Sequence, residues 1–358
     1  MRYLVTGGAG FVGSHLVDTL VDRGHSALVL DDLSTGRVSN LGHAMRTGRV
    51  EFVEGSTADS ELVDELVGSV DACYHLASAV GVSLVVSRPL DSLLGNVHGV
   101  ENVLRAGARH RRRVLYTSTS EIYGKASRGA LSEHADRLLG PIQKSRWSYA
   151  ISKAFGESLA FGLAAEGAET IVARLFNTTG PRQSGAYGMV VPRFVRQALN
   201  GDPLTVYGDG SQSRCFAHVQ DTVDALIALI EHDEALGNAY NVGSDCEVSI
   251  LELARRVIER TGSRSTVEHV PFEDAYGEGF EELGRRQPDT TALRALTGWQ
   301  PLLTLDEVID DMAIHERVSE GLEPAALNGG RSVRQRSRWG ARLSVGDAGA
   351  PLEGPAVG

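Results

Sequence analysis

A phenol and an ammonium group one helical turn apart are the side chains of this sequence that most directly suggest catalysis. Tyr149 and Lys153 begin and end the segment YAISK (149–153), so a helix would carry both on one face. An ordinary tyrosine, with a pKa of about 10, is a poor base at neutral pH, but a nearby lysine charge favours the phenolate and lowers that pKa. Tyr149 would then accept the proton of a substrate hydroxyl group.

Two hydroxyl-bearing residues followed by a carboxylate form a second group that could take part in a reaction. Thr119, Ser120 and Glu121 come directly after the apolar segment 113–118, which has the composition of a buried strand. Ligands of parallel α/β sheets bind beyond the carboxyl ends of the strands. We therefore expect the Thr119 hydroxyl to hydrogen bond the same substrate oxygen as Tyr149, and Glu121 to place a carboxylate close to the reacting ring.

Glycines near the N-terminus indicate which cofactor would take part. Gly7, Gly10 and Gly13 follow the apolar segment 3–5, and helical apolar spacing then leads to a second apolar segment at 27–30. The arrangement is typical of a turn that binds the pyrophosphate of a dinucleotide. The three glycines permit, in order, a tight turn, close approach of the backbone to the phosphates, and close packing of the helix on the strand.

Asp31 follows the second of these apolar segments and favours one dinucleotide over another. Its carboxylate can accept a hydrogen bond from the 2′-hydroxyl of an adenosine ribose, whereas it would repel a 2′-phosphate. We therefore expect NAD rather than NADP. With NAD bound, Tyr149 would take up the hydroxyl proton as a hydride leaves the substrate, and Lys153 would also hydrogen bond the nicotinamide ribose.

Strand-length apolar segments alternate with longer segments of helical periodicity through the first half of the chain. This alternation predicts an α/β fold, a Rossmann-type doubly wound parallel sheet with helices on both faces. The further expected strands lie at 50–53, 70–77, 113–118 and 170–175, and the expected helices at 59–67, 89–109 and 147–165.

The pattern changes after residue 177, where Pro, Gly and polar clusters become frequent and the elements shorten. We expect an NAD-binding domain at 1–177, followed at 178–322 by mainly a smaller C-terminal α/β substrate lobe. Two segments of that second part, Thr222–Ile230 and Ala239–Val242, are expected to return to the sheet. Residues 323–358 lack apolar periodicity and are rich in Gly, Arg and Pro, which predicts a disordered tail.

Bulk composition excludes several classes of partner. The formal net charge of −11 argues against nucleic acid, since binding a phosphate backbone needs a basic surface.

The three cysteines lie far apart without a CxxC pair, which predicts reduced thiols and neither a disulfide framework nor a metal site. No apolar run reaches the ~18 residues of a membrane span, and the first strand begins too early for a signal peptide. We therefore expect a soluble, cytoplasmic protein.

Taken together, the motifs resemble those of the extended short-chain dehydrogenases/reductases, in particular the NAD-dependent nucleotide-sugar epimerase/dehydratase family. The resemblance extends from residue 1 to about residue 318. The motifs that carry it are TGGAGFVG (6–13), HLAS (75–78), Asn96 in a long helix, TSEIYG (119–124), YAISK (149–153), RLFNTTGPR (174–182), PLTVYGDGSQSRCF (203–216) and RRQPD (285–289). One departure is Ser56, where many members carry an aspartate near the adenine.

The resemblance implies a UDP-sugar or other nucleotide-sugar substrate and a homodimer formed through the helices at 89–109 and 147–165. The residues implied in catalysis are Thr119, Glu121, Tyr149 and Lys153. Those implied in NAD binding are Gly7, Gly10, Phe11, Val12, Gly13, Asp31, Leu76, Ala77, Asn96, Tyr149 and Lys153. Those implied in substrate binding are Ser120, Asn177, Arg182, Arg214 and Arg286. Asn177 and Arg214 would contact the diphosphate, and Arg286 matches an arginine near the substrate in decarboxylating members.

A shared first step is also implied, the oxidation of C4 of a nucleotide-linked sugar by bound NAD. Three outcomes then remain open. A hexuronate becomes a β-keto acid that loses CO₂, after which C5 is protonated and C4 is reduced. A 4-epimerase instead returns the hydride to the other face of the ketosugar, and a 4,6-dehydratase removes the C5 proton and expels the C6 hydroxyl group.

The sequence features divide between these outcomes. The TSE run at 119–121 resembles that of UDP-glucuronate decarboxylases and mannose-type dehydratases, whereas glucose-type dehydratases carry an aspartic acid at the position of Ser120. Met189 stands where the decarboxylases have an arginine for the carboxylate, and segment 180–192 resembles some UDP-sugar 4-epimerases. Arg182 could hold a carboxylate instead. We place a UDP-glucuronate decarboxylase slightly ahead of a 4-epimerase and then a dehydratase, with a non-catalytic NAD-binding sensor as the hypothesis from outside the class.

Overall fold

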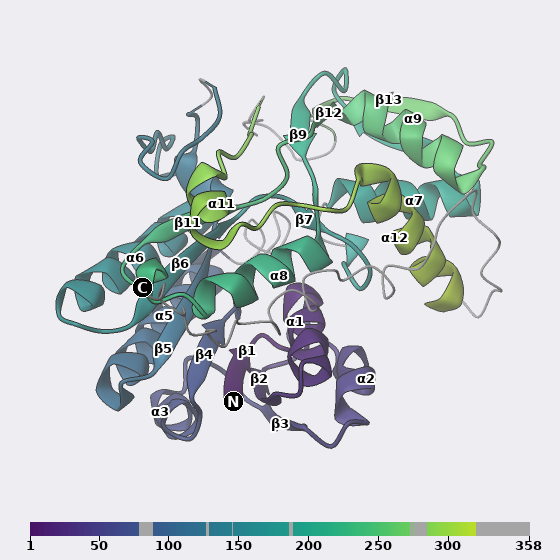
Figure 1. The fold of residues 1–358 in the computed structure, drawn as a ribbon. Coiled ribbons are helices and arrows are strands. Elements are labelled where there is room, and N and C mark those ends of the chain that lie inside the picture. Colours follow the sequence, from purple (N-terminus) through teal and green to yellow (C-terminus); the bar gives the residue numbers. More distant parts are fainter. Residues whose placement is uncertain are drawn as a thin grey trace, which may run out of the picture.

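The computed structural model describes residues 1–78, 89–126, 129–144, 146–185, 189–272, 274 and 285–319. The predicted tail at 323–358 lies outside the described residues. Figure 1 shows two groups of elements, a large one built on the N-terminal sheet and a smaller one built from the later part of the chain.

A seven-stranded parallel sheet forms the centre of the larger group, with the strand order β11-β6-β5-β4-β1-β2-β3. This order confirms the predicted Rossmann-type fold class. Its strands are β1 (Arg2–Thr6), β2 (Ser26–Asp31), β3 (Val50–Glu54), β4 (Ala72–His75), β5 (Arg113–Thr119), β6 (Thr170–Leu175) and β11 (Ala239–Val242). Because β11 pairs with β6, the predicted return of Ala239–Val242 to the sheet is also confirmed.

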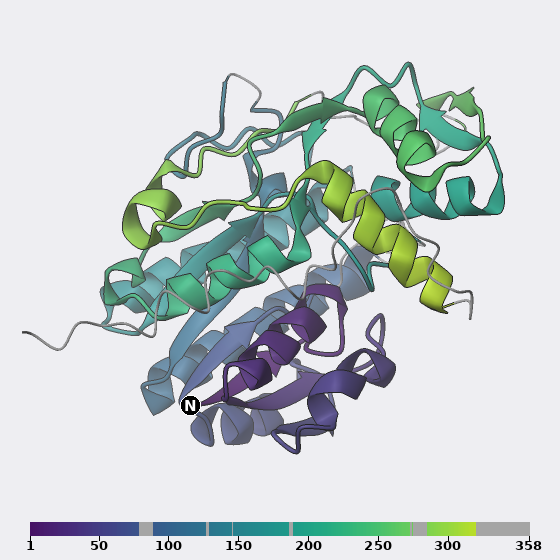
Figure 2. The ribbon, with the colours of Figure 1, turned by 45° about the vertical axis from the view of Figure 1, so that its right-hand side comes forward.

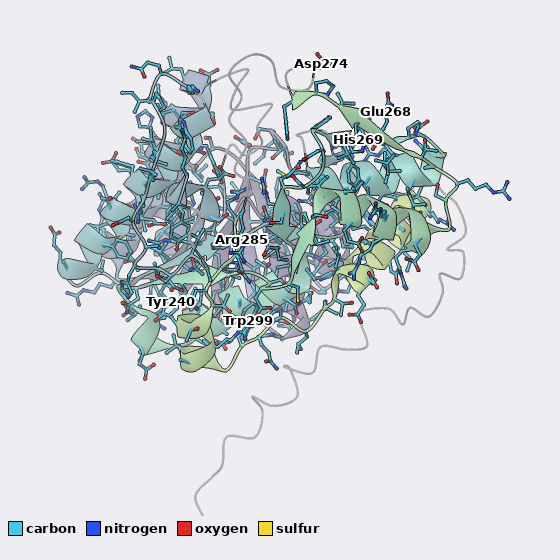
Figure 3. All side chains as sticks on the ribbon, turned by 90° about the horizontal axis from the view of Figure 1, so that it is seen from above. Tyr240, Glu268, His269, Asp274, Arg285 and Trp299 are labelled. Atoms are coloured by element: carbon cyan, nitrogen blue, oxygen red, sulfur yellow. The ribbon has the colours of Figure 1, made fainter. Side chains whose placement is uncertain are left out.

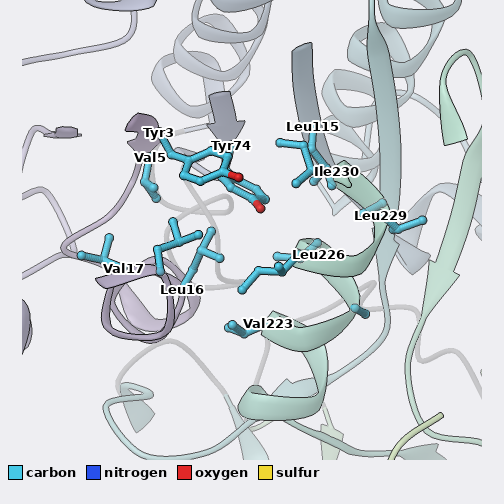
Figure 4. Packing of buried hydrophobic residues seen from close by; sticks show 14 of the residues in the cluster. Tyr3, Val5, Leu16, Val17, Tyr74, Leu115, Val223, Leu226, Leu229 and Ile230 are labelled. Carbon is cyan, nitrogen blue, oxygen red and sulfur yellow. The ribbon is translucent and has the colours of Figure 1, made fainter. Parts of the chain in front are cut away.

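Both faces of this sheet are buried, and successive residues of β1 show how. Tyr3 and Val5 belong to the core cluster under α1 (Phe11–Asp22) and α8 (Val219–Ile230). Leu4 points the other way, into the cluster under α3 (Ser60–Gly68), α5 (Pro89–His110) and α6 (Arg146–Ala165). Side chains of a strand alternate between faces, so an uninterrupted apolar strand needs helices on both sides. Figure 4 shows Tyr3 and Val5 of β1 facing α8 across the first of these clusters.

The smaller group has a core of its own beside the sheet (Figure 2). It pairs β8 (Leu204–Tyr207) with β13 (Val267–Val270) in parallel and β9 (Ser213–Cys215) with β12 (Glu247–Ser249) antiparallel. Its helices are α7 (Val190–Asn200), α9 (Ile250–Thr261) and α12 (Leu305–Ser319). Seen from above, Glu268 and His269 of β13 lie at the far side of this group from Tyr240 of β11 (Figure 3).

Short elements complete the described parts of the chain. They are η1 (Val38–Leu41), α2 (Gly42–Met45), η2 (Ser120–Tyr123), β7 (Thr178–Thr179), β10 (Ala217–His218), η4 (Asp233–Ala235) and α11 (Thr291–Thr297). Among the described helices, none combines the length and apolar character needed to cross a bilayer. Cys73 and Cys215 are buried and unbridged, whereas Cys246 is exposed.

Close packing at the first turn generates a stability prediction. A Cβ added to Gly13 would overlap the Gly7 carbonyl oxygen and lie 2.8 Å from the Gly8 Cα atom, so Gly13→Ala must push helix α1 away from β1. We expect a loss of about 1–3 kcal/mol in unfolding free energy together with weakened NAD binding, measured by denaturant titration and calorimetry. The matched control is Gly162→Ala at an exposed position of α6, where nothing lies within 4 Å of the new Cβ. It should stabilise the helix by up to about 1 kcal/mol, and equal behaviour of the two variants would contradict the packing argument.

Candidate active site

One cleft of about 1010 Å³ contains almost every residue that the sequence analysis singles out. It extends from the glycine turn, past the carboxyl ends of β2, β4 and β5, to the smaller group of elements. The carboxyl ends of parallel strands meet at a single edge of a sheet, which explains why motifs scattered along the chain converge there. The cleft is therefore the candidate active site.

The glycine turn has the features that a bound pyrophosphate requires. Gly7 has a left-handed backbone, with φ of +70°, and a Cβ at this position would lie 2.8 Å from the Ala77 nitrogen. The N-cap of α1, Gly10, provides no side-chain hydrogen bond to the helix N-terminus. Because Gly10 does not cap the helix, the first N–H groups of α1, from Phe11 and Val12 onwards, can donate hydrogen bonds to a phosphate.

Asp31 lies at the end of β2 and lines the cleft, as expected of a group that binds ribose. Its two carboxylate oxygens accept hydrogen bonds from the backbone nitrogens of Leu33 and Ala9, each at 2.9 Å. These bonds fix the carboxylate beside the glycine turn. The arrangement fits an adenosine ribose, since each carboxylate oxygen can accept a further hydrogen bond.

The loop after β4 joins the glycine turn to the catalytic residues. Leu76 and Ala77 are tied to Thr6 of β1, through its carbonyl and hydroxyl oxygens respectively, at 3.2 Å each. The Ser78 hydroxyl donates to the Asn96 side-chain oxygen at 3.1 Å. Asn96 lies in the predicted long helix, here α5, and all four residues other than Thr6 line the cleft.

Lys153 is buried directly beneath the reacting phenol. Its ammonium group donates to the Thr117 carbonyl oxygen at 2.8 Å and lies 5.9 Å from the centre of the Tyr149 ring. Only 3% of the lysine is exposed. Burial lowers its pKa to about 7, although the nearby Glu157 carboxylate opposes that shift. The predicted Tyr–Lys pair is thus present on one face of α6, at the cleft.

In the protein chain without NAD, the pKa of Tyr149 shifts in the opposite direction to the one expected for the complete site, which includes the charges of Lys153 and of the nicotinamide ring. Burial and the charge of Glu121 raise the pKa of Tyr149, and hydrogen bonds with Ser78 and Thr119 oppose the increase without reversing it. The sequence argument counted the lysine charge but not the desolvation of the phenol, which disfavours its anionic form. The positive nicotinamide ring of bound NAD would act in the opposite direction.

Arg286 reaches the same centre from the C-terminal part of the chain. Its Nη1 donates to a Glu121 carboxylate oxygen, in an ion pair, and lies 3.4 Å from the Ser120 hydroxyl oxygen. Arg286 is 8% exposed, so the guanidinium is largely removed from water. The structure therefore combines an acid, a cation and a hydroxyl group beside the Tyr149–Lys153 pair.

The remaining predicted substrate residues also line the cleft but have protein partners of their own. The Asn177 amide donates to the Cys215 carbonyl oxygen at 3.0 Å, and Arg214 donates to the Ser213 carbonyl oxygen at 2.7 Å. Arg182 has a left-handed backbone, with φ of +68°, and forms an ion pair of 2.6 Å with Asp18 of α1. Arg182 is thus anchored on helix α1, which follows the glycine turn, and its Nη1 has no hydrogen-bond partner within the described residues.

Ser78 and Glu157 act on the catalytic pair and were missed by the sequence reasoning. Ser78 hydrogen bonds Tyr149, and Glu157 supports the charge of Lys153. The spacing of Tyr149, Lys153 and Glu157, one helical turn each, was a usable signal for Glu157. Ser78 is the last residue of the HLAS motif (75–78), but the motif did not reveal its contact with Tyr149, because that contact depends on the path of the loop after β4.

The fold and the cleft together define a dinucleotide-binding α/β protein, with a Tyr–Lys pair where the sequence analysis expects the catalytic residues. Residues 3–243 match the profile of the NAD dependent epimerase/dehydratase family. The chain belongs to this family, which confirms the resemblance seen in the motifs and makes NAD its cofactor. It is accordingly an NAD-dependent nucleotide-sugar modifying enzyme.

Relatives with assigned activities match most of the chain. UDP-N-acetyl-alpha-D-glucosaminuronate decarboxylase of Bacillus cytotoxicus is 41% identical over 86% of this chain and 94% of its own length. UDP-glucuronic acid decarboxylase 1 of Arabidopsis thaliana is 36% identical over 87% of this chain and 69% of its own. Among solved structures, UDP-glucose 4-epimerase of Thermotoga maritima superimposes with a TM-score of 0.80 at 27% identity, covering 89% of this chain and 100% of that one.

No metal centre is evident in the residues that the structure describes, since they contain no group of three or more His, Cys, Asp or Glu side chains placed to hold an ion. Side chains supply the positive charges at the cleft, and Lys153, Arg182, Arg214 and Arg286 are among them. These cations can meet an anionic ligand even though the chain as a whole is acidic.

The geometry at Tyr149 generates a kinetic prediction. Tyr149→Phe removes the proton acceptor but keeps the ring, so oxidation of the sugar should fall by about two to four orders of magnitude while NAD binding stays nearly unchanged. Because burial raises the pKa of Tyr149, oxidation by the native enzyme should accelerate as the pH rises and more phenolate forms. Single-turnover rates across a pH series, with NAD titrations, measure both effects. A fully active Tyr149→Phe enzyme would disprove the assignment.

Proposed function

We propose that the protein is an NAD-dependent decarboxylase of a UDP-hexuronate. The observation that carries the proposal is the ion pair between the buried Arg286 and the half-buried Glu121, beside Tyr149 at the end of β5. A simple 4-epimerase needs only a base and a hydride acceptor at C4, whereas loss of CO₂ also needs groups that control a carboxylate and deliver a proton to C5. Arg286, Glu121 and the Ser120 hydroxyl supply groups of this kind.

The reaction would begin at C4. Tyr149 accepts the C4 hydroxyl proton, Thr119 hydrogen bonds the same oxygen, and Lys153 favours the phenolate by its charge. NAD held by the glycine turn and Asp31 would supply the oxidant, since it can accept the C4 hydrogen with its electron pair and give both back at the end. The resulting 4-keto uronate is a β-keto acid, so the bond between C5 and the carboxylate breaks and its electron pair passes into an enolate, as CO₂ leaves.

The second half of the reaction reverses the charge movements. The enolate takes a proton at C5, and the C4 ketone then regains hydrogen from the cofactor and the Tyr149 proton on its oxygen. The Arg286 guanidinium can pair with the carboxylate before CO₂ leaves and with Glu121 afterwards, since an arginine fork suits either anion. Arg182, held by Asp18, would instead serve an anionic group nearer the cofactor helix.

The relatives support two candidate substrates. One relative is named for UDP-N-acetyl-alpha-D-glucosaminuronate and the other for UDP-glucuronic acid, and these compounds differ at C2 of the sugar. We propose that this enzyme uses one of the two, with Asn177 and Arg214 holding the diphosphate at the cleft. Purified protein with NAD should release CO₂ and a UDP-pentose or its 2-acetamido analogue from one of these compounds.

A 4-epimerase is the second candidate, and Met189 is the observation that favours it. Met189 lies at the cleft as the N-cap of α7, at the position where an arginine for the carboxylate would be expected in the decarboxylases. The same incubation distinguishes the two functions by mass spectrometry and chromatography. A C4 epimer without loss of mass would favour the epimerase, and no turnover of any nucleotide-sugar would favour the non-catalytic sensor.

Glu121→Gln tests the role of the acid. The amide keeps the size of the side chain but loses its charge, so we expect CO₂ release to fall by about two orders of magnitude while C4 oxidation is retained. Reduction of bound NAD measures oxidation, and captured CO₂ measures decarboxylation. An Asp245→Asn variant, which changes a carboxylate in an exposed ion pair with Arg294, is the matched control. Unchanged decarboxylation in Glu121→Gln would remove Glu121 from the mechanism.

We also propose a cytoplasmic homodimer formed by the outer faces of α5 and α6. Leu94 of α5 and Phe155 of α6 are 43% and 41% exposed, and the two helices pack side by side. Two other apolar residues of α6, Ala154 and Leu159, pack against the core of their own chain. Exposed apolar patches of this kind mark interaction sites.

Light scattering tests the dimer. Phe155→Asp places a charge in the proposed interface, so it should shift the protein from dimer to monomer at micromolar concentration. The control, Ile142→Asp, changes a side chain that is 77% exposed in the segment before α6 and should leave the mass unchanged. A monomeric native protein would dismiss the proposal.

A further inference from the structure

A buried ion pair lies one turn beyond Lys153 on the catalytic helix. Glu157 of α6 is 0% exposed and Arg174 of β6 is 3% exposed. The Arg174 Nε and Nη2 atoms donate to the two Glu157 carboxylate oxygens at 3.0 and 2.8 Å, and Arg137 adds a third contact to Glu157 at 2.5 Å. Such a two-pronged pair has little freedom to move, so it fixes Arg174 with respect to α6.

Arg174 continues this network towards the end of β5. Its Nη1 donates to the Tyr123 hydroxyl oxygen at 2.9 Å, and that hydroxyl group donates to the side-chain oxygen of Asn241 at 2.7 Å. Tyr123 is the last residue of η2, whose first two residues are Ser120 and Glu121. The network therefore passes directly behind the acid that pairs with Arg286.

Asn241 is the junction at which the network meets the C-terminal segment. It is 0% exposed, and its amide nitrogen donates to the carbonyl oxygens of Leu131 and Asp289 at 2.8 and 3.0 Å. Leu131 in turn donates to the Gln287 carbonyl oxygen at 2.8 Å and accepts from the Asp289 nitrogen at 2.9 Å. Gln287 follows Arg286 directly in the chain, so these bonds fix the backbone next to the arginine.

We propose that Tyr123 and Asn241 are positioning residues that hold the Arg286 segment in register with Glu121. The inference rests on the proposed decarboxylation, for which Arg286 and Glu121 must act together. Neither positioning residue lines the cleft, so each acts through the backbone of the segments that carry Glu121 and Arg286. Loosening the segment should change what happens to the 4-keto sugar more than how fast it forms, because Tyr149 and Lys153 are held by α6.

Tyr123→Phe is the primary test, since it removes one hydroxyl group and keeps the buried ring. Asn241→Ala is the second variant, which leaves a polar space that water can enter if the first variant does not fold. Thr170→Val is the matched control. Thr170 is also buried, at 2% exposure, and the variant loses one hydrogen bond of 2.8 Å, from the Thr170 hydroxyl group to the Ala160 carbonyl oxygen of α6.

Two measurements on the full-length holoenzyme test the positioning role. The first is the ratio of CO₂ released to sugar oxidised at C4, which should fall about tenfold in Tyr123→Phe and Asn241→Ala but not in Thr170→Val. The second is amide hydrogen exchange at Leu131 and Asp289, which should accelerate by a similar factor in the first two variants alone.

The outcomes separate this inference from the proposed function. Oxidation and CO₂ release that fall in equal proportion, or unchanged exchange at Leu131 and Asp289, would overturn the positioning role. Failure of both variants to fold where Thr170→Val folds would also overturn it, because the network would then be purely structural. Native enzyme that releases no CO₂ from either hexuronate would contradict the proposed function instead, and the exchange measurement would then decide the inference alone.

Discussion

The ion pair between the buried Arg286 and Glu121 is the interaction on which the rest of the site depends. Arg286 lies almost out of water, and its ion pair with Glu121 compensates for the lost hydration. Breaking a buried pair on one side alone is strongly unfavourable, since the remaining charge has no partner. The C-terminal segment is therefore held over the end of β5 by the same contact to which we assign a role in the proposed reaction.

Desolvation sets the character of the catalytic pair. Burial lowers the pKa of Lys153 to about 7 and raises that of Tyr149, so the protein alone favours neutral forms of both groups. Glu157 and the hydrogen bonds from Ser78 and Thr119 work against this tendency. The pair is thus sensitive to any further positive charge that enters the cleft, and bound NAD brings such a charge to the phenol.

The two groups of elements contribute different residues to the cleft. The parallel sheet places the glycine turn, Asp31, the TSE run and the Tyr–Lys pair at one edge, as its topology requires. The smaller group adds Arg214 and the region of α7, and the segment between the two groups adds Arg286. Cofactor chemistry and substrate recognition therefore meet across a boundary between cores, where different sugars can be accommodated without changing the sheet.

The sequence by itself determined the fold class, the family and the cofactor, because these follow from local patterns: apolar strands of fixed length, three spaced glycines and a YxxxK turn on a helix. β6, for example, has the predicted bounds of 170–175. Only the tertiary structure decided that Arg182 pairs with Asp18, that burial raises the pKa of Tyr149, and that Arg286 meets Glu121. These facts depend on which distant segments pack together and on how much water they exclude, and neither property is encoded in the spacing of neighbouring residues.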